Sequence, residues 1–371
     1  MRVPPRVPLV PPRRSSLAPA AAGAAVRYFE HGIGERVARL DRHARAYLRS
    51  PNTVRYFERR RFVRATREFL RSAGLPGGDP DAPATSGKRF PDGAQYRVEI
   101  PSVEGPDVLE AVLAEAAARR VVVHRVSQGS GGMLLTDGEL RAMASTAVDA
   151  AVELSLFARP VAAWDTSALS TAPGGGPVAA QARGTEQLVH ALEDVRRTAE
   201  AGIRSVLITD LGVLSVASRM REAGELPADM RFKISVQMGL ANPASIRIAE
   251  DLGADSYNVP TDFTVAQLAA VRAATDLPLD VYVEAPDDMG GFVRHYEIAE
   301  IVRVAAPVYV KFGLRNAPNI YPSGLHLTPT AVALGRERVR RARIGLDLLH
   351  RYAPDAVAST LPAEGLAVPV R

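Results

Sequence analysis

The sequence predicts an α/β fold, a (β/α)8 barrel of the TIM type behind an N-terminal helical extension. Between residues 95 and 352, eight short runs rich in β-branched residues each precede a helical pattern, which is typical of βαβ units. Eight such units are the number that closes a barrel. A doubly wound open sheet is the alternative, but no GxGxxG motif follows the first predicted strand.

The predicted strands are short and apolar at alternate positions, and cover residues 96–100, 121–125, 152–157, 205–209, 232–237, 256–259, 279–284 and 308–312. The predicted helices cover residues 106–119, 136–150, 185–201, 211–223, 242–252, 264–275, 293–304 and 328–352. We expect Thr136, Asn242 and Thr264 to be N-caps, because their side-chain oxygens can accept from free backbone N–H groups. Gly202 and Gly253 are expected to end helices just before strands.

Four segments flank the predicted barrel. Residues 1–22 are expected to be a disordered tail, 23–73 a basic helical segment, 74–94 a linker and 353–371 a C-terminal tail. Residues 1–75 contain 17 basic and 5 acidic side chains, whereas the rest contains 29 basic and 36 acidic. This asymmetry permits contact with a nucleic acid through residues 24–73, although we favour solvated helix faces or docking on the acidic body.

The chain has no cysteine, which excludes disulfides, thiolate metal sites, cysteine nucleophiles and a cysteine-ligated iron–sulfur cluster. No run of about 18 apolar residues is present, so no membrane span is expected. Arg13 and Arg14 precede an Ala-rich run, but Pro19 and Gly23 interrupt it, which argues against an export signal. A cytoplasmic location is therefore expected.

Polar residues occupy one side of most predicted strands, although a barrel axis is usually filled by Val, Ile and Leu. Charges on the axis must be paired or hydrogen-bonded, because burying them alone is costly. Groups near the start of a strand belong to the floor of the barrel, and groups near its C-terminal end face the catalytic mouth. Arg97, Glu153, Lys233 and Asp280 are accordingly predicted to form structural ion pairs in the floor.

The site candidates lie at or just beyond the C-terminal ends of the strands. The predicted catalytic residues are Glu99, Asp210, Glu284 and Lys311. The predicted substrate-binding residues are Arg125, Gln237, Asn258, His295 and Arg315. In two strands the alternation leaves the orientation open, so that either His124 or Arg125, and either Thr209 or Asp210, can face the axis.

Loops after the strands add further candidates. In the loop 126–132, the residues Gly129, Gly131 and Gly132 can let backbone N–H groups approach an anionic ligand or cofactor. The segment 160–184 is interpreted as a mobile lid. The stretch after Glu284 is the densest cluster of ionisable residues in any predicted loop, with Asp287, Asp288, Arg294, His295 and Tyr296.

Several chemistries are compatible with these residues. Glu284 or Glu99 can act as a general base. Lys311 can form a Schiff base with a carbonyl substrate or pair with a substrate carboxylate. A divalent metal held by Glu99, Asp210 and Glu284 is a further hypothesis, since hard cations prefer oxygen ligands. No HxH or HExxH spacing supports a zinc site.

Residues 205–214, 234–260 and 262–285 resemble the U32 family of collagenase-like peptidases. The shared features are a DLGVL strand–turn, a strand with Ser and Gln before an Asn-initiated helix, and a strand that ends in a Glu-containing run. The resemblance implies a TIM-like core. Family members that hydroxylate RNA or quinones bind an iron–sulfur cluster through cysteines and use prephenate, and that chemistry does not carry over to a chain without cysteine.

Three functional hypotheses follow. The first is a small-molecule enzyme with lyase, aldolase or isomerase chemistry on a carboxylate or phosphate substrate. The second is a U32-like peptidase or hydrolase. The third is a non-catalytic, RNA-associated protein that uses the basic N-terminal segment.

Overall fold

The computed structural model describes residues 63–164, 168–173 and 175–371. The chain divides into two compact units, Met1–Leu70 and Arg71–Arg371. In the first unit the described residues are helical, and Arg64 pairs with Glu68 one turn later at 2.8 Å. The predicted tail 1–22 and most of the basic segment 23–73 lie outside the described residues.

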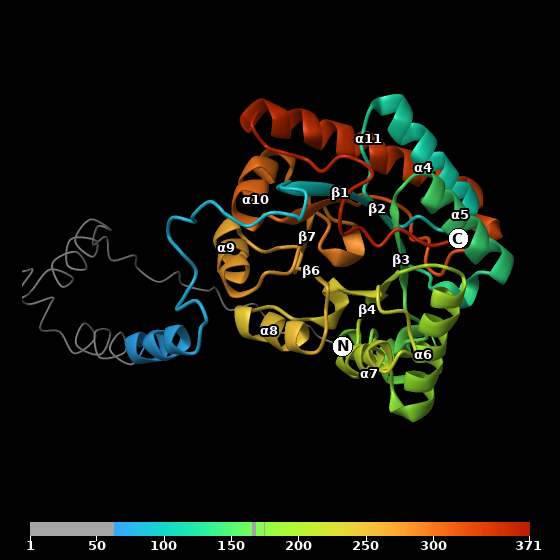
Figure 1. Ribbon diagram of the computed structural model, residues 1–371, viewed down its shortest axis with the longest axis horizontal. Coiled ribbons are helices and arrows are strands. Elements are labelled where there is room, and N and C mark those ends of the chain that lie inside the picture. Colours follow the sequence, from blue (N-terminus) through green and yellow to red (C-terminus); the bar gives the residue numbers. More distant parts are fainter. Residues whose placement is uncertain (1–62, 165–167, 174) are drawn as a thin grey trace, which may run out of the picture. The chain divides into compact units, whose positions relative to one another are not determined.

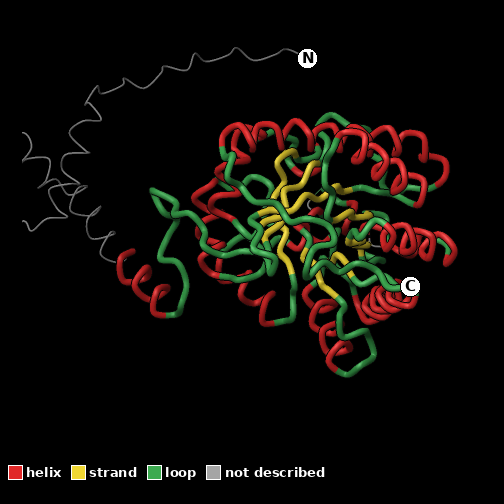
Figure 2. Tube along the Cα trace, turned by 45° about the horizontal axis from the view of Figure 1, so that its top comes forward, coloured by secondary structure: helices red, strands yellow, loops and turns green. Residues whose placement is uncertain are grey.

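The second unit is a closed barrel of eight parallel strands in the order of the sequence, so the predicted (β/α)8 fold is confirmed. Figures 1 and 2 show the strands at the centre with helices around them. The strands are β1 (Tyr96–Pro101), β2 (Arg125–Gln128), β3 (Glu153–Phe157), β4 (Ser205–Ile208), β5 (Arg231–Ile234), β6 (Ser256–Asn258), β7 (Leu279–Glu284) and β8 (Val308–Phe312). The helices are α4 (Pro106–Arg119), α5 (Asp137–Asp149), α6 (Gly184–Glu200), α7 (Leu211–Glu222), α8 (Pro243–Asp251), α9 (Val265–Ala274), α10 (Ile298–Ala305) and α11 (Thr328–Tyr352).

The main hydrophobic core lies between the barrel and the helices. Val98, Phe232 and Ile234 are fully buried members of it, and burying one such side chain contributes about 1.5–3 kcal/mol. The alternate side chains of the same strands turn to the axis. The hydrophobic alternation of each strand therefore fixes which of its polar groups enter the barrel.

Helix boundaries follow the predicted local chemistry. Thr136, Asn242 and Thr264 each cap a helix in a reciprocal capping box. Gly202 and Gly253 have φ angles of 90° and 95°, which the absence of a Cβ permits, and each leads from a helix into the next strand.

Two elements begin four or five residues later than the sequence predicts. The ladder of β2 starts at Arg125 rather than at residue 121, because Val121 N–H still bonds to the Ala116 carbonyl and closes the end of α4. Helix α10 starts at Ile298 rather than at residue 293, after the 3-10 turn His295–Glu297. The shift of β2 moves Ser127 and Gln128 from the predicted loop into the barrel wall.

Residues outside the predicted barrel close its N-terminal end. Phe90 and Ala94, from the predicted linker 74–94, form a small buried cluster with Tyr309. The C-terminal segment lies on the same side, where the Ser359 carbonyl is 2.9 Å from His124 Nε2 and Val370 N–H donates to the Gly202 carbonyl at 2.8 Å. These segments cover part of the floor, where a cavity of about 310 Å³ lined by Arg97, Arg125 and Glu153 remains.

Candidate functional site

Glu99 is the centre of an ion-pair network on the barrel axis. Its carboxylate lies 2.5 Å from Lys233 Nζ, 3.0 Å from Lys311 Nζ and 3.3 Å from Arg125 Nη1, and it accepts a hydrogen bond from Ser127 Oγ at 2.7 Å. Burial by itself raises the pKa of Glu99, but the three cations together outweigh it and hold the pKa well below its usual range. Glu99 is therefore a charged counter-ion.

Arg125 extends this network toward the floor. Its guanidinium lies 2.7 Å from Glu153 and 3.0 Å from Asp280, and it stacks on the Tyr309 ring at 3.5 Å. Lys233 contacts Asp280 at 3.1 Å, so the predicted floor ion pairs are confirmed for Glu153, Lys233 and Asp280. Arg97 pairs separately with Asp92 at 3.3 Å. The carboxylates of Glu99, Glu153 and Asp280 thus balance the cations of Arg125, Lys233 and Lys311. Glu99 and Arg125, predicted as site residues, belong to this balanced layer.

His124 is turned away from the axis, which settles the orientation that the sequence left open. Its Nδ1 accepts a hydrogen bond from Val98 N–H at 3.0 Å. Burial lowers the pKa of His124 to about 4, so the ring is neutral near pH 7. It is a satisfied core histidine.

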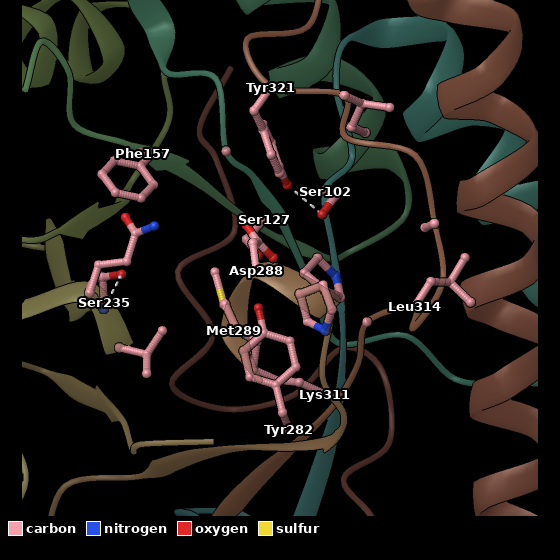
Figure 3. A pocket seen from close by; sticks show the side chains of 18 of the residues that line it. Ser102, Ser127, Phe157, Ser235, Tyr282, Asp288, Met289, Lys311, Leu314 and Tyr321 are labelled. Atoms are coloured by element: carbon pink, nitrogen blue, oxygen red, sulfur yellow. Dashed lines mark hydrogen bonds between the residues drawn. The ribbon is translucent and has the colours of Figure 1, made fainter. Parts of the chain in front are cut away.

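A cavity of about 480 Å³ opens above the network at the C-terminal mouth of the barrel. This is the end at which barrel enzymes carry their active sites. Six of the candidates from the sequence line it, namely Gly129, Gln237, Asn258, Asp287, Asp288 and Lys311. Figure 3 shows Lys311 and Tyr282 at one side of the space, with Tyr321 and Ser102 across it.

Lys311 connects the cavity to the network. Its side chain is 1% exposed, and its Nζ lies 3.0 Å from Glu99 and 4.5 Å from the centre of the Tyr282 ring. The side-chain amide of Asn258, with its oxygen toward Lys311, accepts a hydrogen bond from Nζ at 3.1 Å. Carboxylate, amide and ring together orient the Lys311 amine at the floor of the cavity.

Glu284 does not face the axis, and the expectation from alternation is wrong at this position. A register irregularity between Tyr282 and Glu284 places Glu284 opposite the outward-facing Phe312. Its carboxylate lies 3.3 Å from Arg341 of α11 and 3.4 Å from His295 Nε2. Burial raises the pKa of Glu284, but these neighbours and the N–H of Arg315 outweigh it and lower the pKa.

Glu284, His295 and Arg315 form a cluster behind the cavity wall. His295 is buried, and its ring packs edge-on against Phe312 at 5.8 Å. Arg315 donates its backbone N–H to Glu284 at 3.0 Å, while its exposed side chain lies 3.7 Å from Asp287. None of the three is among the residues that line the cavity.

Asp210 is an N-cap. Its Oδ1 accepts a hydrogen bond from Val213 N–H of α7 at 3.0 Å, and its Oδ2 accepts one from Ala182 N–H at 3.3 Å. The structure therefore does not bring Glu99, Asp210 and Glu284 together, as the metal hypothesis requires. Among the described residues, no group of three or more His, Cys, Asp or Glu side chains is placed to hold a metal ion.

The glycine loop has protein partners for its N–H groups. Gly129 N–H and Ser130 N–H donate to the buried Glu104 at 2.7 and 3.1 Å. Gly131 N–H donates to Gln128 Oε1 at 2.8 Å, and Gly132 N–H bonds to Asp194. The loop thus binds an anion, as its pattern predicts, but the anion is Glu104. Gly129 is also required by packing, since a Cβ there would lie 2.5 Å from the Tyr321 ring.

The sequence interpretation missed several residues of the cavity wall, among them Ser102, Arg159, Tyr321 and Arg338. Ser102 directly follows β1, with a φ of 60° that is rare outside glycine. Asp288 lies at the rim, where burial and the charge of Asp287 raise its pKa. The segment 160–184, expected to be a lid, contributes no described residue to the lining.

Comparison with known proteins confirms the resemblance inferred from the sequence. Residues 179–285 match the model of peptidase family U32. A U32 peptidase structure is similar with a TM-score of 0.33 and 17% identity, over 56% of this chain and 73% of that one. No curated protein sequence matches the chain.

Other solved structures resemble the barrel more broadly. A phosphonopyruvate hydrolase complex with oxalate and Mg²⁺ has a TM-score of 0.36 and 16% identity, over 72% of this chain and 88% of that one. A truncated 3-deoxy-D-arabino-heptulosonate 7-phosphate synthase from Thermotoga maritima has a TM-score of 0.39 and 15% identity, over 69% and 89%. Scores this low assign neither a reaction nor a ligand to this chain.

No helix among the described residues has both the length and the apolar character needed to cross a bilayer.

Proposed function

We propose that this chain is an enzyme that acts on a small anionic substrate, a carboxylate or a phosphate, at the C-terminal mouth of the barrel. The reaction is of the lyase, aldolase or isomerase type. One observation carries the proposal: the amine of Lys311 is held at the floor of an open cavity by Glu99 and Asn258. A volume of about 480 Å³ is within the range of small-molecule sites.

Lys311 can stabilise negative charge that develops on a substrate oxygen. Reactions of this type pass through enolate-like states, and a donor that is already oriented stabilises such a state without reorganising. Glu99 balances the charge of Lys311 before the substrate arrives. Asp288, at the rim of the same cavity and with a raised pKa, can take up or return the proton.

Substitution of Lys311 tests this role. The chain has only three lysines, Lys88, Lys233 and Lys311, so an adduct is readily mapped. We expect Lys311→Met to abolish turnover of a substrate found by screening 2-oxo acids and sugar phosphates, with and without Mg²⁺. Stability should fall less than in Glu99→Gln, since Glu99 keeps Lys233 and Arg125.

The control is Lys88→Met, which removes a lysine that pairs with the exposed Asp276 on the outside of the barrel. Full turnover in Lys311→Met would refute the proposal. Borohydride reduction during turnover separates the two chemistries of Lys311. A mass increase on the Lys311 peptide identifies a Schiff base, and an unmodified peptide identifies the electrostatic role.

A U32-like hydrolase is the second candidate, because the matched segment supplies part of the cavity. Ser235, Gln237, Asn258 and Tyr282 all come from residues 179–285. The test is incubation of the full chain with gelatin and a peptide library, with and without divalent metal, and mass spectrometry of the products. Cleavage that Lys311→Met abolishes would favour this candidate, and no cleavage under any condition would remove it.

A further inference from the structure

Arg338 of α11 is a buried cation that faces the cavity and, in the described part of the chain, forms no ion pair within 4.0 Å. Its side chain lines the cavity, and the residue is 5% exposed. Among the described residues, no carboxylate oxygen lies within 4.0 Å of its guanidinium, whereas Arg125, Lys233 and Lys311 each have one. Arg338 therefore differs from the cations of the axis.

The hydrogen bonds of Arg338 are also incomplete. Its Nη1 lies 3.5 Å from the Ser102 carbonyl oxygen, at the long limit of a hydrogen bond, and its Nε has no partner. The charge of Arg338 acts on the nearby Glu104, but that carboxylate accepts its hydrogen bonds from Gly129 and Ser130 N–H and lies beyond ion-pair distance. An unpaired guanidinium in a buried wall is costly, and an anion in the cavity would offset that cost with charge-assisted hydrogen bonds.

Ser102 supplies a second donor beside Arg338. The Tyr321 hydroxyl donates to Ser102 Oγ at 2.5 Å, so the hydrogen of the Ser102 hydroxyl is left for another acceptor. Ser102 also keeps a φ of 60°, a strained conformation for a serine. Strained backbone of this kind concentrates at ligand sites, where the surrounding structure holds it in place.

We propose that Arg338 and Ser102 form an anion subsite that binds a phosphate or carboxylate group. Lys311, already balanced by Glu99, then meets an uncharged oxygen of the same molecule. The substrate class is therefore a compound with an anionic group at one end and a carbonyl or hydroxyl at the other, such as an oxo acid or a phosphorylated ketone. The assignment of the anion to Arg338 stands alone, and only the part concerning Lys311 rests on the proposed function.

Calorimetric titration of the full chain with inorganic phosphate and, separately, with malonate tests the subsite. We expect saturable binding of at least one anion, weakened about 10- to 100-fold in Arg338→Met and less in Arg338→Lys. Comparison of the two anions shows whether the subsite prefers phosphate or carboxylate. Arg340→Met is the matched control, because Arg340 lies on the same helix, is 48% exposed and pairs with Glu337 at 3.0 Å.

Thermal unfolding distinguishes a ligand-binding arginine from a structural one. In buffer without phosphate or carboxylate, Arg338→Met should unfold at the parent temperature or above it, because the substitution removes an unpaired buried charge. The rise in Tm that the anion causes in the parent should disappear in the variant. A structural arginine would give the opposite pattern, a lower Tm in both Arg338→Met and Arg338→Lys with the anion effect intact.

The subsite is overturned if neither anion binds the parent, if Arg338→Met binds like the parent, or if the structural pattern appears. Its failure is separate from failure of the proposed function. Anion binding that depends on Arg338, in a chain for which no turnover is found, upholds the subsite and not the reaction. Turnover that depends on Lys311 but not on Arg338 upholds the proposed reaction and not the subsite.

Discussion

Replacing Glu99 with glutamine should destabilise the barrel strongly, because Glu99 is the counter-ion of two lysines at once. Glutamine keeps the shape of the side chain and can still accept from Ser127, but it carries no charge. Lys233, at 2.5 Å, and Lys311, at 3.0 Å, would then face a neutral amide inside the barrel. Asp280 would remain beside Lys233, while among the described residues Lys311 has no other carboxylate within 4.0 Å.

The magnitude follows from the burial of this network. Breaking a buried ion pair by removing one partner costs about 3–5 kcal/mol. For a barrel of this size that corresponds to a fall in Tm of roughly 10 °C, at about 2–4 °C per kcal/mol. Urea unfolding at pH 7 measures the change. Glu300→Gln is the control, since Glu300 is 52% exposed in its pair with Arg303 and should change stability by less than about 0.5 kcal/mol.

The pH dependence of the free energy of unfolding provides a second test of the role of Glu99, because the direction of the change with pH is defined. The pKa of Glu99 is lower in the folded chain than in the unfolded one, so its contribution is fully present above the ordinary glutamate pKa. That contribution is lost as the pH falls from about 4.5 toward the folded pKa. The contribution of the Glu99 charge to the gap between parent and Glu99→Gln should therefore shrink as the pH falls below about 4.5. A variant within 1 kcal/mol of the parent at pH 7, or a gap that widens in acid, would refute the reasoning.

Two further predictions concern Asp194 and Gly129. Burial raises the pKa of Asp194 to about 7. Between about pH 4 and 7, Asp194 is therefore protonated in the folded chain and ionised in the unfolded one. The free energy of unfolding should fall as the pH rises through this range, by up to about 1.4 kcal/mol per pH unit. Asp194→Asn should therefore gain stability over the parent between pH 4.5 and 7.5 in urea unfolding, and parallel curves would contradict this. Gly129→Ala would place a Cβ 2.5 Å from the Tyr321 ring and should weaken phosphate or malonate binding by displacing Tyr321 from Ser102. Gly138→Ala is the control, because its Cβ would meet nothing nearer than 3.9 Å, and it should bind phosphate or malonate like the parent. Equal anion binding by the two variants would contradict the prediction.

The alternation of apolar residues predicted the interior of the barrel well, because a strand has only two faces. Lys311 and Asn258 face the cavity as expected, and Lys233 and Asp280 pair in the floor. Depth along the axis was harder to predict. Glu99 is near the end of its strand in the sequence, but β1 continues to Pro101, so Glu99 lies one layer below the mouth.

Other errors arise from geometry that no local pattern encodes. The irregularity after Tyr282 turns Glu284 toward α11, and nothing in the run LDVYVE marks it. The partner of the glycine loop, Glu104, comes from the segment after a different strand. For Arg338 a signal did exist. The buried residues of α11 recur at helical spacing as Ala331, Gly335, Arg338, Val339, Ala342, Gly345, Leu346 and Leu349, and an arginine within such a stripe is exceptional.

The interior cations of this barrel divide by whether a carboxylate neutralises them, and the division predicts opposite responses to substitution. Lys233 and Arg125 hold strands together through Glu99, Glu153 and Asp280, so removing a partner leaves a charge uncompensated and lowers stability. Arg338 already lacks such a partner, so removing it takes away a cost that the folded chain bears without a ligand. Lys311 is neutralised like the first group but lines the cavity like Arg338. A variant of Lys311 should therefore affect turnover more than stability, and a variant of Glu99 should affect stability first. A variant of Arg338 should weaken anion binding without lowering stability.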